Sequence, residues 1–194
     1  MSMQLIACQQ CGAATPPHDV VSYGSSGGCY RQLCTACVNL DAAACMGVDG
    51  FEDVRFTPVC ITDARAVERE FHFRLRLFGQ LALDAFELVD GSPGGHQFQI
   101  IADADADPWA LLAAMIERIR RTLAVTHLSP EGRGLSISGS TVRGRITSDS
   151  SASQPLPALV IDGHEVSWEA FGRMLMSFEG WQFKLDIVDR SEAP

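Results

Sequence analysis

The 194-residue sequence predicts an α+β protein, in which a small metal-binding module precedes an antiparallel sheet with two main helices. Three observations support this prediction. Two CxxC cysteine pairs occur near the N-terminus, segments of period-two hydrophobicity follow them, and two segments of helical periodicity are interspersed among the later strands. Strands and helices in this order favour α+β over a doubly wound parallel sheet.

Residues 1–47 carry the strongest signal in the sequence. Cys8 and Cys11 form one CxxC pair, Cys34 and Cys37 form another, and 22 residues separate the pairs. Two residues between thiolates allow both sulfurs to reach one ion from a tight turn, and four thiolates match tetrahedral Zn²⁺. We therefore predict one structural zinc ion bound by these four cysteines. Four protein ligands leave no open position for water, which argues against catalytic zinc.

The chain around the cysteine pairs suggests two folds for this module. Segments 20–23 and 30–33 can form strands on either side of a Gly/Ser turn, and residues 38–44 can form a helix. A knuckle, a hairpin and ligands at a helix start describe a treble clef, whereas a second knuckle in place of the helix would make a zinc ribbon. About 47 residues enclose too small a core to be secure alone, so zinc should stabilise the fold.

The other cysteines and the start of the chain indicate a cellular setting. Seven cysteines, an odd count with paired CxxC spacing, argue against a secreted disulfide framework and favour a reducing cytoplasm. The first residues show no signal peptide, and no apolar run approaches the roughly 18 residues that span a bilayer. We expect Cys29, Cys45 and Cys60 to pack as small apolar groups and not to bind the ion.

Residues 51–194 are predicted to form a second domain that begins with strands. Residues 71–77 and 96–101 alternate apolar and polar side chains. Together with 81–89 they should form an antiparallel meander. Residues 90–95, rich in Gly and Pro, are expected to form a turn between the last two strands.

The rest of this domain is predicted as helix, hairpin, helix and strand. An Asp-Pro start and apolar residues at helical spacing predict a helix over 107–127. Segments 135–138 and 141–147 are expected to pair as a hairpin. A helix over 167–178 and a final strand over 181–188, with four alternating apolar side chains, complete the domain.

Polar side chains on the predicted meander suggest a second kind of site. They are His72, Arg74, Arg76, Asp84, Glu87 and His96. Gathered in one cleft, these side chains would support acid–base chemistry. Such a face is more often the solvated side of an antiparallel sheet, and no triad or dyad is recognisable, so we predict no catalytic residue.

Charge and composition narrow the functional classes. The chain has 24 acidic and 15 basic side chains, and residues 1–47 contain a single arginine, Arg31, and no lysine, so nucleic-acid binding is not expected. We predict a zinc-stabilised protein-interaction or adaptor protein with an unknown protein partner. The α+β domain would offer a second binding face or a dimer interface. The alternative is an enzyme of unknown reaction, with its active site in that domain and zinc as scaffold only.

Three features of the sequence together resemble a known type of chain. They are the two CxxC knuckles, the segment FHFRLRLFG at 71–79 and the ending FEGWQFKL at 178–185. This combination resembles a group of uncharacterised bacterial proteins that join an N-terminal CxxC…CxxC module to a C-terminal domain of unknown function. The resemblance covers nearly the whole chain and implies a bacterial cytoplasmic setting. It implies no activity, substrate or catalytic residue.

Overall fold

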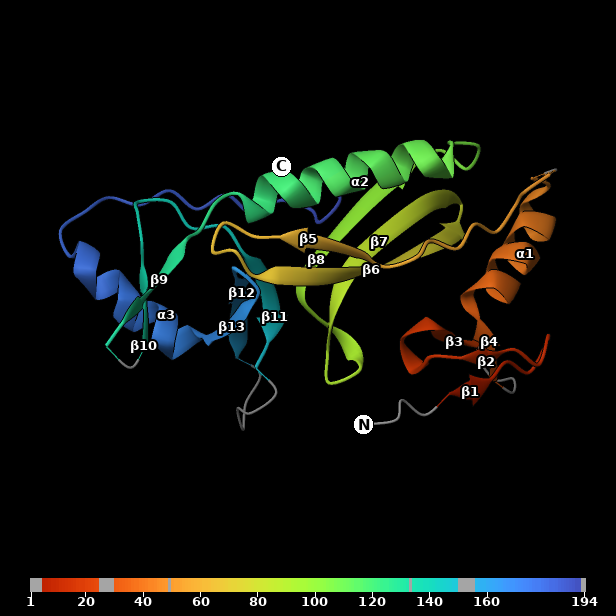
Figure 1. The fold of residues 1–194 in the computed structure, drawn as a ribbon, viewed down its shortest axis with the longest axis horizontal. Helices are drawn as coiled ribbons and strands as arrows, with labels where there is room; N and C mark the ends of the chain where they lie inside the picture. Colours follow the sequence, from red (N-terminus) through yellow and green to blue (C-terminus); the bar gives the residue numbers. More distant parts are fainter. Residues whose placement is uncertain (1–4, 25–29, 49, 133, 150–155, 193–194) are drawn as a thin grey trace.

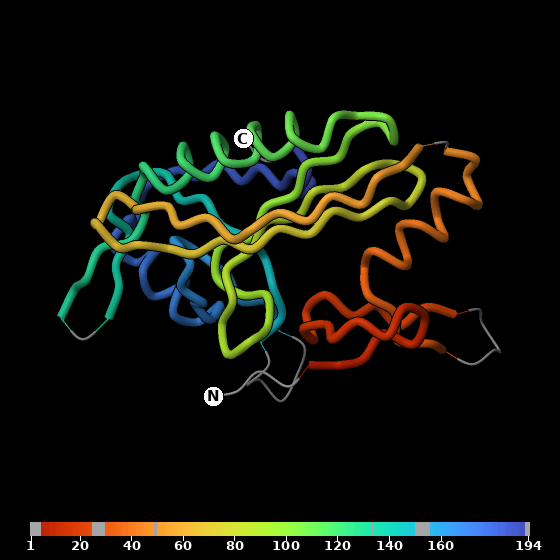
Figure 2. The backbone as a smooth tube through the Cα atoms, turned by 45° about the vertical axis from the view of Figure 1, so that its right-hand side comes forward, coloured from red at the N-terminus to blue at the C-terminus, as the bar shows by residue number. Residues whose placement is uncertain are grey.

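The α+β class predicted from the sequence is confirmed. A computed structural model of the chain describes residues 5–24, 30–48, 50–132, 134–149 and 156–192. These residues form three α-helices and several antiparallel sheets. Figures 1 and 2 place the cysteine-rich N-terminal part at one end of a central sheet and the C-terminal part at the other.

The central sheet contains the predicted meander and one additional edge strand. Its four strands run antiparallel in the order β5-β6-β7-β8. Their bounds are Val59–Thr62 for β5, Glu68–Phe78 for β6, Gln80–Val89 for β7 and Ser92–Ala102 for β8. β5 is short and pairs only with the first part of β6. The remainder of that β6 edge is therefore free to contact other elements.

The turn between β7 and β8 is shorter than the six residues predicted. Asp90 and Gly91, both at positive φ (51° and 80°), reverse the chain, and β8 begins at Ser92. Two consecutive residues with positive φ suit the tight hairpin turns that match strand twist. Gly94 lies inside the strand, where an added Cβ would come within 2.7 Å of the Val89 side chain. Gly91 therefore allows the turn, whereas Gly94 allows the two strands to approach each other closely.

Helix α2 (Pro108–Leu123) covers one face of the sheet (Figure 1). Its N-cap is Asp107, whose carboxylate accepts a hydrogen bond from the Trp109 N–H (2.9 Å). The helix ends four residues before the predicted limit, because the His127 N–H donates to the Asp162 carboxylate (2.8 Å) and not to a helical carbonyl. The buried core between helix and sheet includes Phe71, Leu75, Leu77, Leu81, Leu83, Ala85, Phe98, Met115, Ile119 and Leu123.

The C-terminal part contains two small antiparallel sheets. One pairs β9 (Leu128–Glu131) with β10 (Gly134–Ile137). The other has the order β11 (Arg145–Ser148), β12 (Pro157–Ile161) and β13 (His164–Ser167).

The predicted hairpin of 135–138 with 141–147 is wrong, since its two halves belong to different sheets. Its first half overlaps β10, which pairs with β9, and its second half overlaps β11, which pairs with β12. Gly132, with a φ of 57°, lies in the β9–β10 reversal. β11 pairs with β12, which is apolar and has Ala158 and Ile161 fully buried, and not with the more polar segment 135–138.

Helix α3 (Trp168–Leu175) continues into a short 3-10 helix, η2 (Met176–Phe178), over the segment predicted to be helical. Ser167 caps α3 by accepting a hydrogen bond from the Ala170 N–H (3.2 Å). α3 closes a separate hydrophobic core. The buried residues of that core are Leu128, Ile161 and Val166.

Residues 181–188 form no strand, contrary to the prediction. The four alternating apolar side chains, Trp181, Phe183, Leu185 and Ile187, are 68, 91, 71 and 73% exposed. Alternation indicates which side chains would share a face, but a strand also requires a neighbouring edge for its backbone hydrogen bonds. Within the described residues, this segment has no such neighbour.

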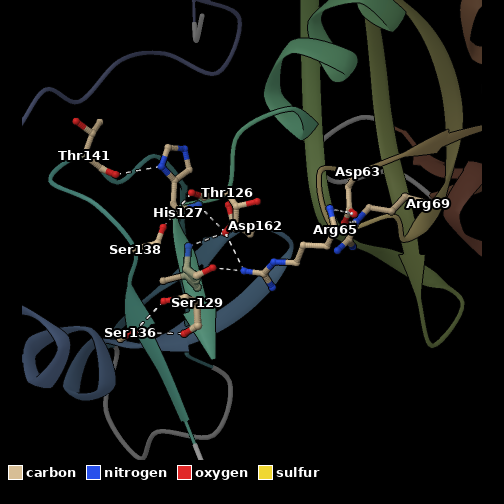
Figure 3. Close-up of polar contacts among 11 residues, drawn as sticks. Asp63, Arg65, Arg69, Thr126, His127, Ser129, Ser136, Ser138, Thr141 and Asp162 are labelled. Carbon is tan, nitrogen blue, oxygen red and sulfur yellow. Dashed lines mark hydrogen bonds and ion pairs between the residues drawn. The ribbon is translucent and has the colours of Figure 1, made fainter. Parts of the chain in front are cut away.

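Polar contacts join the central sheet to the C-terminal part (Figure 3). Arg65, in the loop after β5, donates to the Leu128 carbonyl and lies 3.9 Å from the Asp162 carboxylate. The same carboxylate accepts hydrogen bonds from the backbone N–H groups of His127 and Leu128, both at 2.8 Å. One aspartate therefore fixes the start of β9 and the position of the arginine from the sheet.

Candidate metal centre

The first cysteine pair lies in a tight turn between two short strands, β1 (Ile6–Ala7) and β2 (Ala14–Thr15). The Gly12 N–H donates to the Cys8 carbonyl (2.9 Å), and the positive φ of Gly12 (74°) allows the chain to reverse there. The turn thereby brings Cys8 and Cys11 to the same end of the hairpin.

The second pair lies where a strand passes directly into a helix. β3 (Val20–Tyr23) pairs with β4 (Arg31–Cys34), and α1 (Thr35–Met46) follows without a break. Cys34 is the N-cap of α1, and Cys37 lies in its first turn. Free backbone N–H groups and the helix dipole favour anions at this position, which suits thiolate ligands.

The structure brings the four predicted cysteines together. Their Sγ atoms all lie within 4.8 Å of one another, and both the Cys8–Cys37 and Cys11–Cys34 sulfur pairs are 3.8 Å apart. Zinc–sulfur bonds of about 2.3 Å in a tetrahedron place sulfurs about 3.8 Å apart. Three of the cysteines are buried, and Cys11 is exposed. The number, type and spacing of these donors fit a single metal ion.

Burial and hydrogen bonding act in opposite directions on these thiols. Burial alone would raise the pKa of Cys8, but the backbone N–H groups of Cys11, Cys34 and Gln10 lower that pKa to about 6. The Cys34 N–H lies 3.2 Å from the Cys8 sulfur. Burial raises the pKa of the Cys34 and Cys37 thiols. A bound cation would compensate for clustered thiolates, and its binding would release their protons.

The remaining cysteines do not join this cluster. Cys45, on α1, and Cys60, on β5, are exposed free thiols, so the prediction that they pack in the core is wrong. Cys60 alternates with the buried Ile61 on an edge strand, and Cys45 lies off the α1 face that carries the buried Ala43. Cys29 is outside the described residues. Among the residues that the structure describes, the four cysteines make the one cluster suited to a metal ion.

Helix α1 is attached to the central sheet by Asn39, which is fully buried. Its side chain donates to the Leu75 carbonyl and accepts from the Leu77 N–H, both at 2.9 Å, so it pairs with the β6 edge left free by β5. It also donates to the Asp53 carboxylate (2.8 Å). Sequence analysis did not identify this contact. The sequence feature that could have indicated this contact is Asn39 itself, the single asparagine of the chain, which lies in an apolar helix two residues after Cys37.

A cavity of about 200 Å³ lies where the cysteine module meets the sheet. The short helix η1 (Pro17–Asp19) places His18 beside His72, with ring centroids 5.8 Å apart, and both rings contact Phe86. Burial lowers the pKa of His18, and the charges of His72 and Arg74 lower it further. Within the described residues, the buried Nδ1 of His18 has no hydrogen-bond partner.

The structure separates the polar residues that could have shared one cleft. His72 and Asp84 lie on the polar face of the sheet, whereas the His96 ring stacks on the core residue Phe98, with centroids 6.4 Å apart. His96 Nδ1 lies 2.9 Å from the carboxylate of Glu87. Successive side chains of a strand point to opposite faces, which explains the separation. The cleft considered from the sequence is therefore divided between two faces.

Three family models match the chain in tandem, and each is described as a domain of unknown function. DUF7685 matches residues 7–49, DUF7686 matches 52–124 and DUF7713 matches 125–192. The three matched ranges correspond, in this order, to the cysteine module, the central sheet with α2, and the C-terminal part. No curated protein and no solved structure matches the chain. The bacterial origin and the two-domain division stay predictions.

In the described parts of the chain, no helix combines the length and the apolar character needed to cross a membrane.

Proposed function

We propose that this chain is a zinc-stabilised protein-interaction protein, in which Cys8, Cys11, Cys34 and Cys37 bind one structural Zn²⁺. The gathering of four sulfurs within 4.8 Å carries this proposal, because it would complete a tetrahedron with protein ligands. Such an ion has no vacant position for a substrate, so its contribution is to fold the module. The order of knuckle, hairpin and helix start favours a treble clef over a zinc ribbon, and exposed free thiols suit a reducing compartment such as the cytoplasm.

Residues 181–188 supply the surface best suited to a partner. The apolar side chains of Trp181, Phe183, Leu185 and Ile187 recur with a period of two, and each is at least 68% exposed. Contiguous exposed apolar surface of this kind is typical of protein-interaction sites. Interaction through this segment would therefore bury side chains that are now in water.

Both ends of this segment are attached to the rest of the molecule. The Trp181 N–H donates to the Phe178 carbonyl (2.9 Å), and their rings pack edge to face. Nine residues later, Arg190 donates to the Phe98 carbonyl of β8 (3.2 Å). Within the described chain, no backbone hydrogen bond involves residues 182–188. Because the segment is also exposed, its backbone donors and acceptors are available to a partner.

The partner that fits this stretch is another protein with a free strand edge. Strand addition satisfies the backbone groups of both chains, and alternate side chains then enter apolar pockets. Phe183 and Leu185 would enter the partner, whereas Lys184, paired with Asp186 at 3.1 Å, would face water. The segment would thus acquire in the complex the strand conformation that its sequence pattern predicts.

The test uses three forms of the full-length protein, each purified with its bound partners from the source cell. The partners that are retained are then compared. Wild type and Lys184→Ala should retain the same stoichiometric partner, because residue 184 lies on the solvent side. Phe183→Asp should lose that partner while keeping its zinc and its melting temperature, since Phe183 is 91% exposed. A partner retained by Phe183→Asp would contradict the proposal. A dimer of the chain itself that Phe183→Asp dissociates would reassign the segment to self-association.

The alternative function is an enzyme whose zinc serves as scaffold, and one observation favours it. The junction cavity of about 200 Å³ places His18 beside His72; burial lowers the pKa of His18, and within the described residues its buried Nδ1 has no partner, so it could accept a proton. The test incubates the protein with a metabolite extract and follows the depletion of compounds by mass spectrometry. Depletion by wild type that is lost in His18→Gln, with zinc retained, would support the enzyme.

A further inference from the structure

The polar face of the central sheet holds an aspartate surrounded by arginines. Asp84, on β7, is 1% exposed and lies opposite Arg74 of β6 in the sheet register. Its Oδ2 lies 2.8 Å from Nη2 of Arg76 and 3.3 Å from Nη2 of Arg74. Its Oδ1 accepts a hydrogen bond from Gln99 (2.9 Å). Two arginines and one amide therefore already satisfy this carboxylate.

The C-terminal part brings Arg190 to the same place and Arg145 into electrostatic interaction with Arg190. Arg190 Nη2 lies 4.0 Å from Asp84 Oδ1 and donates to the Phe98 carbonyl at 3.2 Å. Arg145 is the first residue of β11. Burial lowers the pKa of the Arg145 guanidinium, and the neighbouring charge of Arg190 lowers it further. Three arginines from β6 and the C-terminal segment thus surround Asp84, and the charge of Arg190 acts on Arg145 of β11.

This group carries more positive charge than its carboxylates neutralise. Among the described residues, Asp84 is the acid within ion-pair distance of Arg74, Arg76 and Arg190, which leaves two positive charges around it in a chain of formal charge −9. Each of the four arginines has a buried Nε without a partner, and no other described arginine has one. Buried, unpaired donors on charged groups are costly. Ion pairing within the chain therefore does not account for the whole cluster.

We propose that Arg74, Arg76, Arg145 and Arg190 form a binding site for a phosphate group, either inorganic phosphate or the phosphate of a small ester. A dianion matches the two excess charges, and guanidinium groups donate paired hydrogen bonds to oxyanions. The side chains of Arg74, Arg76 and Arg190 are 23, 28 and 37% exposed, respectively, so a ligand can approach them from solvent. The site lies between the sheet and the C-terminal part, and Arg74 also donates to the His18 carbonyl of the cysteine module (2.7 Å).

Arg145 offers the sharpest test of this site. Within the described residues its side chain makes no ion pair and no hydrogen bond, so Arg145→Gln should fold and keep its zinc. The matched control is Arg143→Gln, an exposed arginine two residues earlier. The measurement is isothermal titration calorimetry of the full-length, zinc-loaded protein. The ligands are inorganic phosphate and glycerol 3-phosphate, and sodium chloride at the same ionic strength is the control.

We expect wild type to bind one phosphate per chain in a saturable manner. Arg145→Gln should weaken this binding at least about tenfold, and Arg190→Gln should act in the same direction. Arg143→Gln should stay within about twofold of wild type, because exposed charges contribute little. Binding of both ligands would assign an ester phosphate to the site, and binding of phosphate alone would assign the free ion. No saturable binding, an equal response to chloride, or unchanged affinity in Arg145→Gln would overturn the proposal.

Discussion

The cysteine module and the central sheet each pack antiparallel strands against one helix, yet they are expected to depend on different sources of stability. The buried core of the module consists of Cys8, Leu33, Cys34, Cys37 and Val38, so three of its five members are candidate metal ligands. The core of the sheet contains eleven buried apolar residues from the sheet and α2, including the fully buried Leu83 and Met115, and Ala43 of α1 packs against them. We therefore expect the module to depend on metal coordination for its stability, whereas the sheet relies on the hydrophobic effect.

Removal of the metal should produce the largest effect, and the effect should be confined to the module. Zinc binding contributes on the order of 10 kcal/mol to the folding of modules of this size. We expect Cys37→Ser to lose zinc and to expose the backbone amides of residues 5–24 and 30–48 to hydrogen exchange, while β6, β7 and β8 stay protected. The control is Cys45→Ser, an exposed thiol on the same helix, which should behave as wild type. Full protection of the module in Cys37→Ser would show that its fold does not require the metal.

A cavity in the sheet core should have the next largest effect and should spare the metal. Leu83→Ala removes a fully buried side chain and is expected to lower the free energy of unfolding by about 2–5 kcal/mol in denaturant titrations. The same change at Leu40, which is 49% exposed, should cost less than about 1 kcal/mol. Zinc content should be unchanged in both variants. Loss of zinc from Leu83→Ala would mean that the two regions are not energetically separate.

The contact between the two regions can be weakened without touching either core. Asn39→Ala leaves the Leu75 carbonyl and the Leu77 N–H without their side-chain partners, which should cost about 2–3 kcal/mol. Hydrogen exchange should increase at α1 and at the β6 edge. Gln10→Ala is the control, because it removes only an exposed hydrogen bond to Asp41 (3.1 Å) and should cost about 0.5 kcal/mol or less. Equal stability of the two variants would contradict this role of Asn39.

The smallest predicted effect on stability depends on pH. It involves Glu87, which lies on the face of the central sheet opposite to Asp84. Burial opposes ionisation of Glu87, but hydrogen bonds from His96 and Arg69 lower the pKa of its carboxyl below the ordinary value of 4.5. A carboxyl with a lowered folded pKa stabilises the protein above about pH 4.5, and this contribution is lost as the pH falls through the folded pKa. Glu87→Gln should therefore cost about 1–2 kcal/mol at pH 7 and progressively less below pH 4.

Thermal unfolding of wild type and Glu87→Gln across this pH range measures that difference. Glu117→Gln, at an exposed position on α2, serves as the control and should shift stability by about 0.5 kcal/mol or less at every pH. A difference between wild type and Glu87→Gln that is independent of pH would show that the lost interaction is not ionic.

The comparison also shows what could be predicted from the sequence. Cys8, Cys11, Cys34 and Cys37 were identifiable because the spacing within each pair is a local property of the chain. The meander was identifiable because alternation reports which side chains face the core. Both features depend on a few neighbouring residues, and both were found in the structure.

Features that depend on distant partners were not predictable in the same way. Asn39 binds the backbone of β6 across 36 residues of chain, and no local pattern in α1 indicates that edge. The alternation of residues 181–188 resembles that of the central strands, yet no described strand pairs with it. The arginines around Asp84 are separated by up to 116 positions, from Arg74 to Arg190, and only the fold brings them together.

The central claim, that four cysteines bind one structural zinc ion, can be tested directly on purified full-length protein. Elemental analysis combined with X-ray absorption at the zinc edge measures both the stoichiometry and the ligand set. We predict one zinc per chain, coordinated by four sulfurs at about 2.3 Å. Absence of stoichiometric metal, or a coordination shell in which nitrogen or water replaces a sulfur, would contradict the account.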